Sequence, residues 1–412
     1  MRGRPFNADH RKPLNDRKRL NDRKLLNDRI RVLTIGHSYV VAENRALVRE
    51  VARDSQFDVT VAAPVAFHSG LGTIELQPEP SGSNLTLKAL SARFTRWIQV
   101  FAYDSRSLGT LIENGDFDVV HAWEEPYIYA GYQIARAMAK SDAAFCFRTA
   151  QNIDKRHPFP FSRFERAALE RAQGWIAGGK LVFESRVRHG YPAERGCIMT
   201  LAVDLDAFKP LTPERKQTVA RELGLQPPIV AYVGRLTRAK GIDLMMRAMD
   251  AIGSTTPWSL LVMGAGPMET ELRNWAAARG WSDRVVVRLV AHRDVPAYLG
   301  AADVLLAPSQ TGPRWREQFG RMVIEAFACG VPVLGSDSGE IPYVIGDAGR
   351  SLPENDAAAW AKAIIEVLGS TTMRADMARR GFDRVQPYSV AAVAIQYAAY
   401  YRNLADRRRI AA

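Results

Sequence analysis

The sequence predicts an α/β protein in which two doubly wound, parallel-sheet domains face a cleft. A chain of 412 residues is too long for one ordinary hydrophobic core and favours two domains of about 180 residues each. Each half also opens on an apolar stretch that runs into a glycine-containing loop and then a helix, as at 31–36 and 227–234. That order of strand, loop and helix is typical of the first step of a doubly wound sheet.

The composition is that of a folded globular protein. Hydrophobic residues make up 47% of the chain and charged residues 24%, close to the globular average. The three cysteines, Cys146, Cys197 and Cys329, share no close spacing and lie beside apolar residues. We therefore expect buried, reduced thiols and a reducing cytoplasmic compartment, and no disulfide or metal framework. No apolar run approaches the roughly 20 residues of a membrane-spanning helix, and the N-terminus lacks an apolar signal core.

Much of the net charge of +12 lies at the N-terminus. Residues 1–31 hold eleven Lys or Arg against four Asp, a balance of +7, and the other 381 residues carry +5. Leu-Asn-Asp-Arg recurs there with a period of six, which fits neither a helix nor a heptad. We expect residues 1–29 to form a basic, low-complexity, disordered tail. The alternative is a polybasic surface that contacts anionic lipid head groups.

The first domain is predicted to span residues 30–208. Apolar stretches at 31–36 and 58–64 are expected to be buried strands, with a helix near 44–54 between them. The loop after the first strand, Gly36-His-Ser-Tyr-Val, lacks the G-x-G-x-x-G pattern and so does not predict a dinucleotide site.

A basic, aromatic-rich segment at 88–103 is predicted to be an amphipathic helix. On a helix its apolar side chains would share one face, and such a stripe belongs most often to a core. Those side chains are Phe94, Trp97, Ile98 and Phe101. A second amphipathic helix is expected at 161–173.

The second domain is predicted over residues 209–386, followed by a C-terminal segment, 387–412, that contains an amphipathic helix. Its strands are expected at 227–234, 259–264, 285–292, 304–307 and 331–334. Its helices are expected at 294–299, 321–329 and 357–368, with another that starts near Ile242.

A cationic loop follows the first strand of the second domain. Gly234-Arg235-Leu-Thr-Arg-Ala-Lys240-Gly241 leads from that strand into a helix. Free N–H groups and the positive end of the helix would face the carboxyl edge of the sheet. Arg235 adds a bidentate fork and Lys240 a point charge. Although the loop is not a Walker A motif, the pattern favours binding of phosphate over a solvated pair of cations.

Two carboxylates, Glu317 and Glu325, lie in a later strand–loop–helix step with seven residues between them. The strand at 304–307 runs into a polar loop, and Gly320 stands at the mouth of the helix at 321–329. Their spacing first suggests an acid–base pair. With the cationic loop facing the same cleft, we interpret them instead as anchors for hydroxyl groups.

These residues carry a resemblance to a known family. The run from Glu317 to Glu325, with its Phe-Gly, the preceding Ala-Pro-Ser and the following Ala-Phe-Ala-Cys-Gly-Val-Pro-Val, resembles the donor-sugar signature of glycosyltransferase family 4. The cationic loop is similar to the Gly-Arg-x4-Lys-Gly of that family, whose members are retaining enzymes of the glycosyl transferases group 1 type. The resemblance implies the GT-B fold, with two Rossmann-like domains facing an interdomain cleft and a C-terminal helix, 387–412, that crosses back to the first domain.

The resemblance also implies roles in the donor half. The expected catalytic residues are Arg235 and Lys240, which grip the donor diphosphate, and Glu317, which binds hydroxyls of the donor sugar. Glu325 is expected to bind the ribose hydroxyls. Further donor-binding positions are Gly234, Phe319, Gly320, Arg321 and Met322, where N–H groups from Gly320 to Met322 face the leaving diphosphate.

The first domain is expected to hold the acceptor. In the family, the loop after the first strand contacts acceptor or phosphate, which would make His37, Asn44 and Arg45 cleft residues. As turn and capping residues they would have no such role, and both interpretations stay open. Gln151 stands where many relatives carry histidine, and a glutamine can bond a sugar hydroxyl but cannot shuttle a proton. Many relatives contact lipid through an exposed stripe like the one at 88–103.

The predicted reaction is transfer of a glycosyl group from a nucleotide diphosphate sugar to an acceptor hydroxyl, with retention of the anomeric configuration. The acceptor would be a saccharide or lipid-linked, in polysaccharide or glycoconjugate biosynthesis. No cofactor and no nucleic-acid partner are expected. A metal is not expected either, since the Asp-x-Asp pair at 116–118 opens a strand at its far end and the pair at 204–206 lies by the hinge. The expected location is the cytoplasm, with peripheral contact at the inner face of the membrane. Two alternatives stay open: a GT-B epimerase or phosphorylase, and a catalytically silent nucleotide-sugar-binding protein, which Gln151 motivates.

Overall fold

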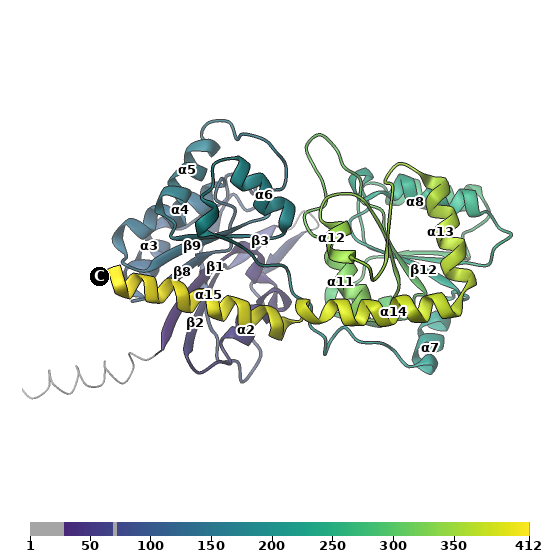
Figure 1. The fold of residues 1–412 in the computed structure, drawn as a ribbon, viewed down its shortest axis with the longest axis horizontal. Helices are drawn as coiled ribbons and strands as arrows, with labels where there is room; N and C mark the ends of the chain where they lie inside the picture. Colours follow the sequence, from purple (N-terminus) through teal and green to yellow (C-terminus); the bar gives the residue numbers. More distant parts are fainter. Residues whose placement is uncertain (1–28, 69–71, 412) are drawn as a thin grey trace, which may run out of the picture.

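The computed structural model describes residues 29–68 and 72–411, and over these ranges the chain folds into two halves, each built on a parallel sheet (Figure 1). The strand order is β11-β10-β9-β8-β1-β2-β5 in the first sheet and β14-β13-β12-β15-β16-β17 in the second. The predicted α/β class with two parallel sheets is therefore confirmed. The predicted tail, apart from Arg29, lies outside the described residues.

The strands of the first sheet are β1 (Ile30–Ile35), β2 (Phe57–Pro64), β5 (Thr86–Leu90), β8 (Val119–Ala122), β9 (Ala144–Thr149), β10 (Gly174–Ala177) and β11 (Gly196–Ile198). Those of the second are β12 (Ile229–Val233), β13 (Ser259–Met263), β14 (Val285–Arg288), β15 (Val304–Ala307), β16 (Val333–Ser336) and β17 (Arg350–Leu352). Short antiparallel pairs are formed by β3 (Ala66–His68) with β4 (Thr73–Glu75) and by β6 (Ala92–Arg93) with β7 (Ala102–Tyr103).

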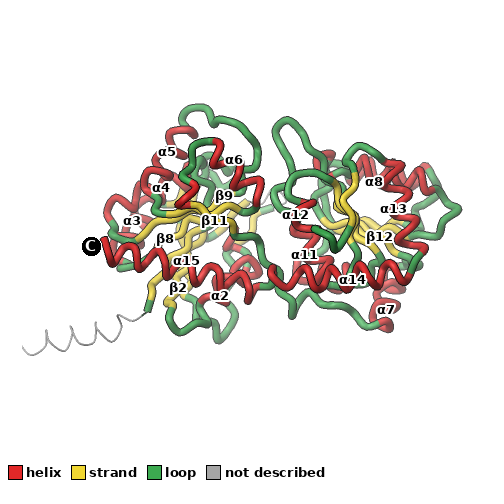
Figure 2. Tube along the Cα trace, in the orientation of Figure 1, coloured by secondary structure: helices red, strands yellow, loops and turns green. Residues whose placement is uncertain are grey.

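The helices of the first half are α2 (Ala46–Val51), α3 (Ser105–Asn114), α4 (Tyr129–Ala137), α5 (Phe161–Arg171) and α6 (Lys180–Arg188). Those that follow are α7 (Pro213–Leu223), α8 (Ile242–Ile252), α9 (Glu269–Ala278), α10 (Val295–Leu299), α11 (Arg321–Ala328), α12 (Ile341–Ile345), α13 (Ala357–Gly369), α14 (Thr371–Val385) and α15 (Val390–Ala411). Helices flank both sheets (Figure 2), so central strands such as β12 and β15 are buried along nearly their whole length and read as continuous apolar runs.

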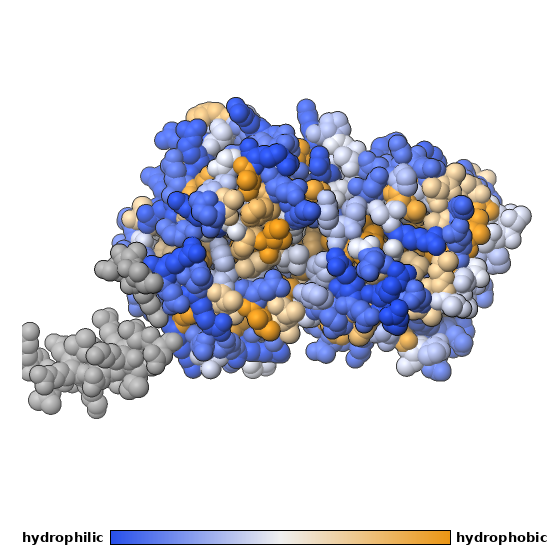
Figure 3. Space-filling view, in the orientation of Figure 1, coloured by the Kyte–Doolittle hydropathy of each residue, from blue (hydrophilic) through white to orange (hydrophobic). Residues whose placement is uncertain are grey.

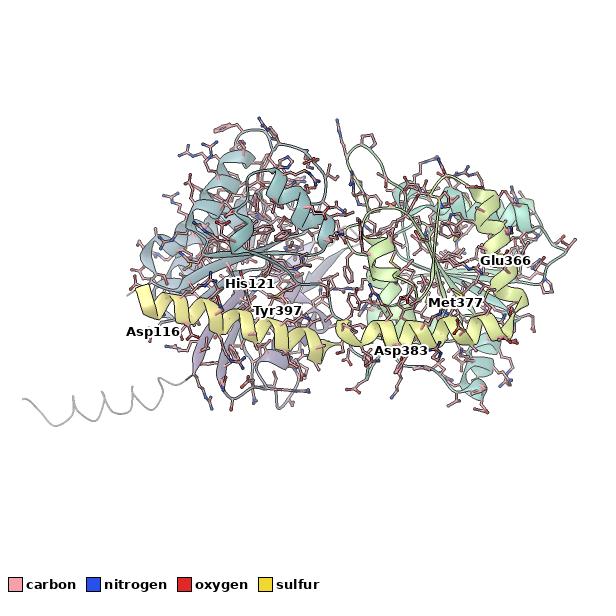
Figure 4. The ribbon with its side chains drawn as sticks, in the orientation of Figure 1. Asp116, His121, Glu366, Met377, Asp383 and Tyr397 are labelled. Atoms are coloured by element: carbon pink, nitrogen blue, oxygen red, sulfur yellow. The ribbon has the colours of Figure 1, made fainter. Side chains whose placement is uncertain are left out.

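The last two helices run end to end along both halves (Figure 1). α14 packs on α11 and α13, and α15 packs on α2 and reaches β1, β8 and β9. Tyr397 of α15 lies beside His121 of β8, with ring centroids 6.0 Å apart (Figure 4). The chain passes between the halves twice, near Val203 and near Tyr388, and the two segments are hydrogen-bonded to each other. Val203 N donates to Tyr388 O (2.9 Å), and Val390 N donates to Val203 O (3.0 Å).

Helix α14 was not predicted, because its apolar residues are few among many charged ones. Its buried positions are few, and its surface is held by charged pairs one turn apart, such as Arg379–Asp383 and Arg380–Asp376. A helix that is polar on most of its surface gives a weak signal of this kind, since its stability comes from such pairs and from docking.

The predicted helix at 88–103 is wrong. The segment consists of the end of β5, the hairpin strands β6 and β7, and turns between them. Its first residues pair with β2 as an edge strand, and Phe94 adopts φ 58°, which a helix does not allow. The aromatic residues therefore share no face: Phe101 is buried, whereas Phe94 and Trp97 are 59% and 60% exposed.

The cysteines are unpaired, as predicted, with Cys146 and Cys329 buried and Cys197 partly exposed. Among residues 29–68 and 72–411, no helix combines the length and the apolar run needed to span a bilayer. Hydrophilic residues cover most of the face that carries α14 and α15, with hydrophobic residues in separate patches (Figure 3).

Candidate functional site

The loop after β12 is packed tightly against the loop after β15. Gly241, with φ 77°, lies so close to Pro308 that a Cβ would come 1.7 Å from the Pro308 carbonyl oxygen. Only glycine permits this approach. The preceding 3-10 turn, Arg238–Lys240, is thereby held over the β15 loop, and Lys240 meets Glu317 although 77 residues separate them.

Lys240 and Glu317 form an ion pair at the carboxyl edge of the second sheet. Lys240 Nζ lies 2.5 Å from Glu317 Oε2, and the two side chains are 18% and 9% exposed. Ser309 Oγ donates to the same carboxylate oxygen over 2.7 Å. The ammonium also lies 5.1 Å from the centre of the Trp315 ring. The predicted cation and the predicted hydroxyl anchor are thus direct partners, which fixes both side chains.

Arg235 and the start of α11 both provide hydrogen-bond donors. Arg235 is exposed, and its guanidinium makes no hydrogen bond or ion pair with any described residue. Tyr232 Oη donates to the Arg235 carbonyl oxygen (2.8 Å) and fixes the backbone there. At α11, which starts after Gly320, the side chains of Phe319 and Met322 are buried in the core, at 5% and 7% exposure. These two predicted donor-binding residues can therefore offer a ligand only their backbone N–H groups.

Glu325 lies on the buried face of α11, 4% exposed. Its Oε1 is 3.0 Å from His292 Nε2, and within the described ranges the carboxylate has no other hydrogen-bond partner. Both residues line a cavity of about 330 Å³ between the halves, together with Asn44, Arg321 and Asp204. Sequence reasoning missed His292; its place just beyond β14, at the carboxyl edge, was the available signal.

In the first half, His37 forms an ion pair with a carboxylate that the sequence did not single out. His37 Nδ1 and backbone N each lie 2.6 Å from an oxygen of the fully buried Glu124, and Tyr103 Oη donates to Glu124 over 2.8 Å. Burial alone would lower the pKa of His37, but the charge and hydrogen bond of Glu124 outweigh it and raise that pKa above 6.5. Glu124 thus favours the protonated form of His37 over the form it would take if buried without a carboxylate partner.

This raised pKa makes the stability contributed by His37 depend on pH. Because the folded-state pKa lies above the unfolded one, the contribution is complete below about pH 6.5 and is lost as pH rises through the raised value. Urea unfolding should show His37→Gln less stable than the wild type by about 1–2 kcal/mol at pH 5.5, with a smaller difference at pH 9. A difference that grows with pH would contradict the ion pair, and Glu124→Gln should lower the His37 pKa measured by NMR.

Of the other residues predicted on the acceptor side, Asn44 lies at the cavity and Arg45 does not. Asn44 lines the cavity, and its Oδ1 lies 3.5 Å from Arg321 Nη1 of the other half. Arg45 is a correction: it is fully buried, and all three guanidinium nitrogens are used by Glu79, Tyr39, Gln77 and Pro78 within the first half. It therefore holds the chain at 77–79 and does not face the cleft.

Gln151 is 5% exposed, and its Oε1 accepts from the backbone N–H of Ile153 over 3.1 Å. Its neighbour Asn152, which the sequence did not single out, crosses the cleft: Asn152 Nδ2 donates to the Glu317 carbonyl oxygen over 2.8 Å. The loop after β9 therefore contacts the second half through Asn152.

The Asp pairs lie where they were expected. Asp116 is at the outer end of the first half, away from the second (Figure 4), and Asp118 accepts the backbone N–H of Arg31. Asp204 caps the backbone N–H groups of Asp206 and Ala207. In the part of the chain that is described, no three His, Cys, Asp or Glu residues are grouped to hold a metal ion.

The comparisons with known proteins point to one group of enzymes. Residues 214–384 match the family model of the glycosyl transferases group 1. The chain is 33% identical over 190 residues (45% of this chain, 50% of the relative) to a GDP-mannose-dependent monoacylated α-(1-6)-phosphatidylinositol monomannoside mannosyltransferase of Corynebacterium glutamicum. It is 32% identical over 299 residues (69% of this chain, 62% of the relative) to a D-inositol 3-phosphate glycosyltransferase of Mycobacteroides abscessus. The chain thus spans about half to two thirds of these curated relatives.

Solved structures confirm the predicted GT-B fold. HepE of Anabaena, in complex with UDP and glucose, superposes with a TM-score of 0.70 at 17% identity, covering 91% of this chain and 100% of that one. Sucrose-phosphate synthase of Thermosynechococcus elongatus gives 0.68 at 20% identity, covering 91% and 99%. At these identities the likeness concerns the fold alone.

Proposed function

We propose that this protein is a retaining glycosyltransferase that moves a sugar from a nucleotide diphosphate sugar to an acceptor hydroxyl. One observation supports the proposal most: the Lys240–Glu317 ion pair lies in the loops after β12 and β15, next to Asn152 of the first half. The matched family model covers the ion pair. The cations and N–H groups suit a diphosphate, and the carboxylates suit sugar and ribose hydroxyls.

In this proposal the leaving diphosphate is stabilised by charge without help from a metal ion. Arg235 and the N–H groups at the start of α11 receive the negative charge that grows on the phosphate as the glycosidic bond breaks. Lys240 has three donors and gives one to Glu317, so it links the diphosphate to the sugar anchor. Glu317 orients the sugar hydroxyls. The acceptor oxygen bonds to the anomeric carbon on the face that the phosphate leaves, the bond from that carbon to the phosphate oxygen breaks, and the hydroxyl proton passes to that oxygen, so the configuration is retained. Chelator should leave transfer intact.

The acceptor side of the proposal is less specific. His37 and Asn44 mark where an acceptor hydroxyl enters, on a saccharide or lipid-linked molecule of polysaccharide or glycoconjugate synthesis. Any contact with a membrane would use the exposed Phe94 and Trp97. A panel of nucleotide sugars scored by thermal shift tests the donor assignment, because a ligand that binds the native state stabilises it by mass action. Stabilisation by no nucleotide sugar and no nucleoside diphosphate would remove it.

Replacing Glu325 should weaken the nucleotide specifically through its ribose. Glu325→Ala removes a buried acceptor whose worth to a bound hydroxyl is about 1.5–3 kcal/mol, so affinity for the nucleoside diphosphate should fall roughly tenfold to a hundredfold. Calorimetry with the 2′,3′-dideoxy nucleotide provides the control, since the variant should bind that ligand as the wild type does. An equal loss of affinity for both ligands would show that Glu325 does not bind the ribose hydroxyls.

A further inference from the structure

Helix α6 of the first half begins without a capping side chain of its own. It follows Gly178-Gly179, and no side chain of the preceding residue caps its first turn. The first N–H groups of a helix have no partner within the helix, and Ser, Thr, Asp or Asn at the N-cap usually supply one. Here that partner comes from elsewhere in the fold.

The partner is Glu340, which belongs to the second half. It precedes α12, is 3% exposed, and its Oε1 accepts from the backbone N–H of Leu181. Figure 1 shows α6 and α12 facing each other across the gap between the halves. Burial raises the pKa of the Glu340 carboxyl. Hydrogen bonds from the N–H groups of Leu181, Val182 and Lys180 oppose that rise. Beside this contact, Lys180 Nζ lies 4.9 Å from the centre of the Tyr343 ring.

The contact leaves no room for a side chain at Gly179 unless the Glu340 carboxylate moves. A Cβ on Gly179 would come 2.6 Å from Cδ, 2.7 Å from Oε1 and 2.9 Å from Cγ of Glu340, and these are its three nearest atoms. The backbone of Gly179 is extended, at φ −174°, and tolerates any side chain. Glu340 is thus what an alanine at this position would meet first.

The same residue is tied to the donor site. Glu340 N donates to the Glu317 carbonyl oxygen over 3.1 Å, and Asn152 Nδ2 of the first half donates to that oxygen as well. The Glu317 carbonyl oxygen therefore accepts one hydrogen bond from each half. The side chain of the same residue is paired with Lys240.

We propose that Glu340 is a positioning residue: by capping α6 across the cleft, it couples closure of the two halves to the placement of Glu317. This rests on the proposed function, in which Glu317 holds the donor sugar. When the halves separate, the first turn of α6 loses its cap and the Glu317 carbonyl loses Asn152. Closure restores both at once, so the sugar anchor is set only in the closed molecule.

Two single substitutions and their combination test the coupling in the full-length protein. Glu340→Ala removes the cap, whereas Gly179→Ala displaces the carboxylate from the opposite half by its Cβ. Each should lower kcat about tenfold, equivalent to about 1.4 kcal/mol, leave the Kd of a nucleoside diphosphate within about twofold, and raise the radius of gyration in X-ray scattering. The double variant should be no worse than Glu340→Ala, because the added methyl then has room.

Glu184→Ala is the matched control on the same helix: among the described residues its carboxylate pairs with Lys180, at 3.9 Å on the surface. Its charge repels that of Glu340 and does not cap α6, so the variant should keep wild-type kcat and scattering. Wild-type kcat and scattering in Glu340→Ala would overturn the proposal. The proposal would also be overturned if Gly179→Ala lowered kcat by the same factor in the Glu340→Ala protein as in the wild type. If the wild type transfers from no donor, the proposed function fails, and the scattering of these variants still decides the contact.

Discussion

Lys240→Ala should lower glycosyl transfer by about a hundredfold or more and also destabilise the fold. Both effects come from one position. The variant loses a cation from the diphosphate site, where a charge-assisted contact is worth about 1.5–3 kcal/mol, and leaves Glu317, 9% exposed, without its ion-pair partner. An unpaired buried carboxylate costs a further few kcal/mol. Steady-state kinetics and urea unfolding measure the two effects separately.

Arg238→Ala is the matched control for Lys240. Arg238 lies in the same 3-10 turn but is 73% exposed and pairs with Asp243 and Glu271 on the surface. Such pairs contribute little, so this variant should keep near wild-type transfer and stability. A Lys240→Ala protein with wild-type transfer would remove Lys240 from the diphosphate site.

Arg235→Ala should reduce transfer about tenfold to a hundredfold without changing stability. Arg235 is exposed, and no described residue is a partner for its guanidinium, so the folded protein loses no contact. The loss should fall on kcat/KM with a nucleotide sugar, because the guanidinium acts only on the ligand.

Arg235→Lys separates charge from geometry. A lysine keeps the charge but not the bidentate fork, so partial recovery is expected. Wild-type activity in Arg235→Ala would contradict the assignment, and a lowered unfolding midpoint would show that the guanidinium has a structural partner.

The fold could be predicted where local sequence decides it. Apolar runs such as 304–307 become strands because burial on both faces leaves no polar position, and β15 has the predicted bounds. The prediction failed where the pattern suited two structures. Residues 88–103 carry a helical stripe, yet pairing with β2 and the φ of Phe94 decide the outcome. α14 was not predicted because charged residues cover most of its surface and its buried stripe of Met377, Gly381 and Val385 is narrow.

The candidate site divides in the same way. The residues expected to bind the donor lie in the loops after β12 and β15 or on helix α11, which follows the second loop, so their order along the chain predicts their shared edge of the sheet. The acceptor side depends on contacts between distant residues, as between His37 and Glu124, which are 87 positions apart. Arg45 shows the consequence: a charged residue after a strand suggests a cleft group, but the chain at 77–79 folds over it. A loop that covers a residue in this way does so through tertiary packing, which leaves no periodic signal in the sequence.

The central claim is that the chain transfers a sugar from a nucleotide diphosphate sugar with retention. NMR of the anomeric proton of the product tests it most directly, with the donor that gives the largest thermal stabilisation and a panel of saccharide and lipid-linked acceptors. We predict a product with the anomeric configuration of the donor, formed by the wild type and strongly reduced in Lys240→Ala. An inverted product, or isomerised donor with no transfer to any acceptor, would contradict the claim.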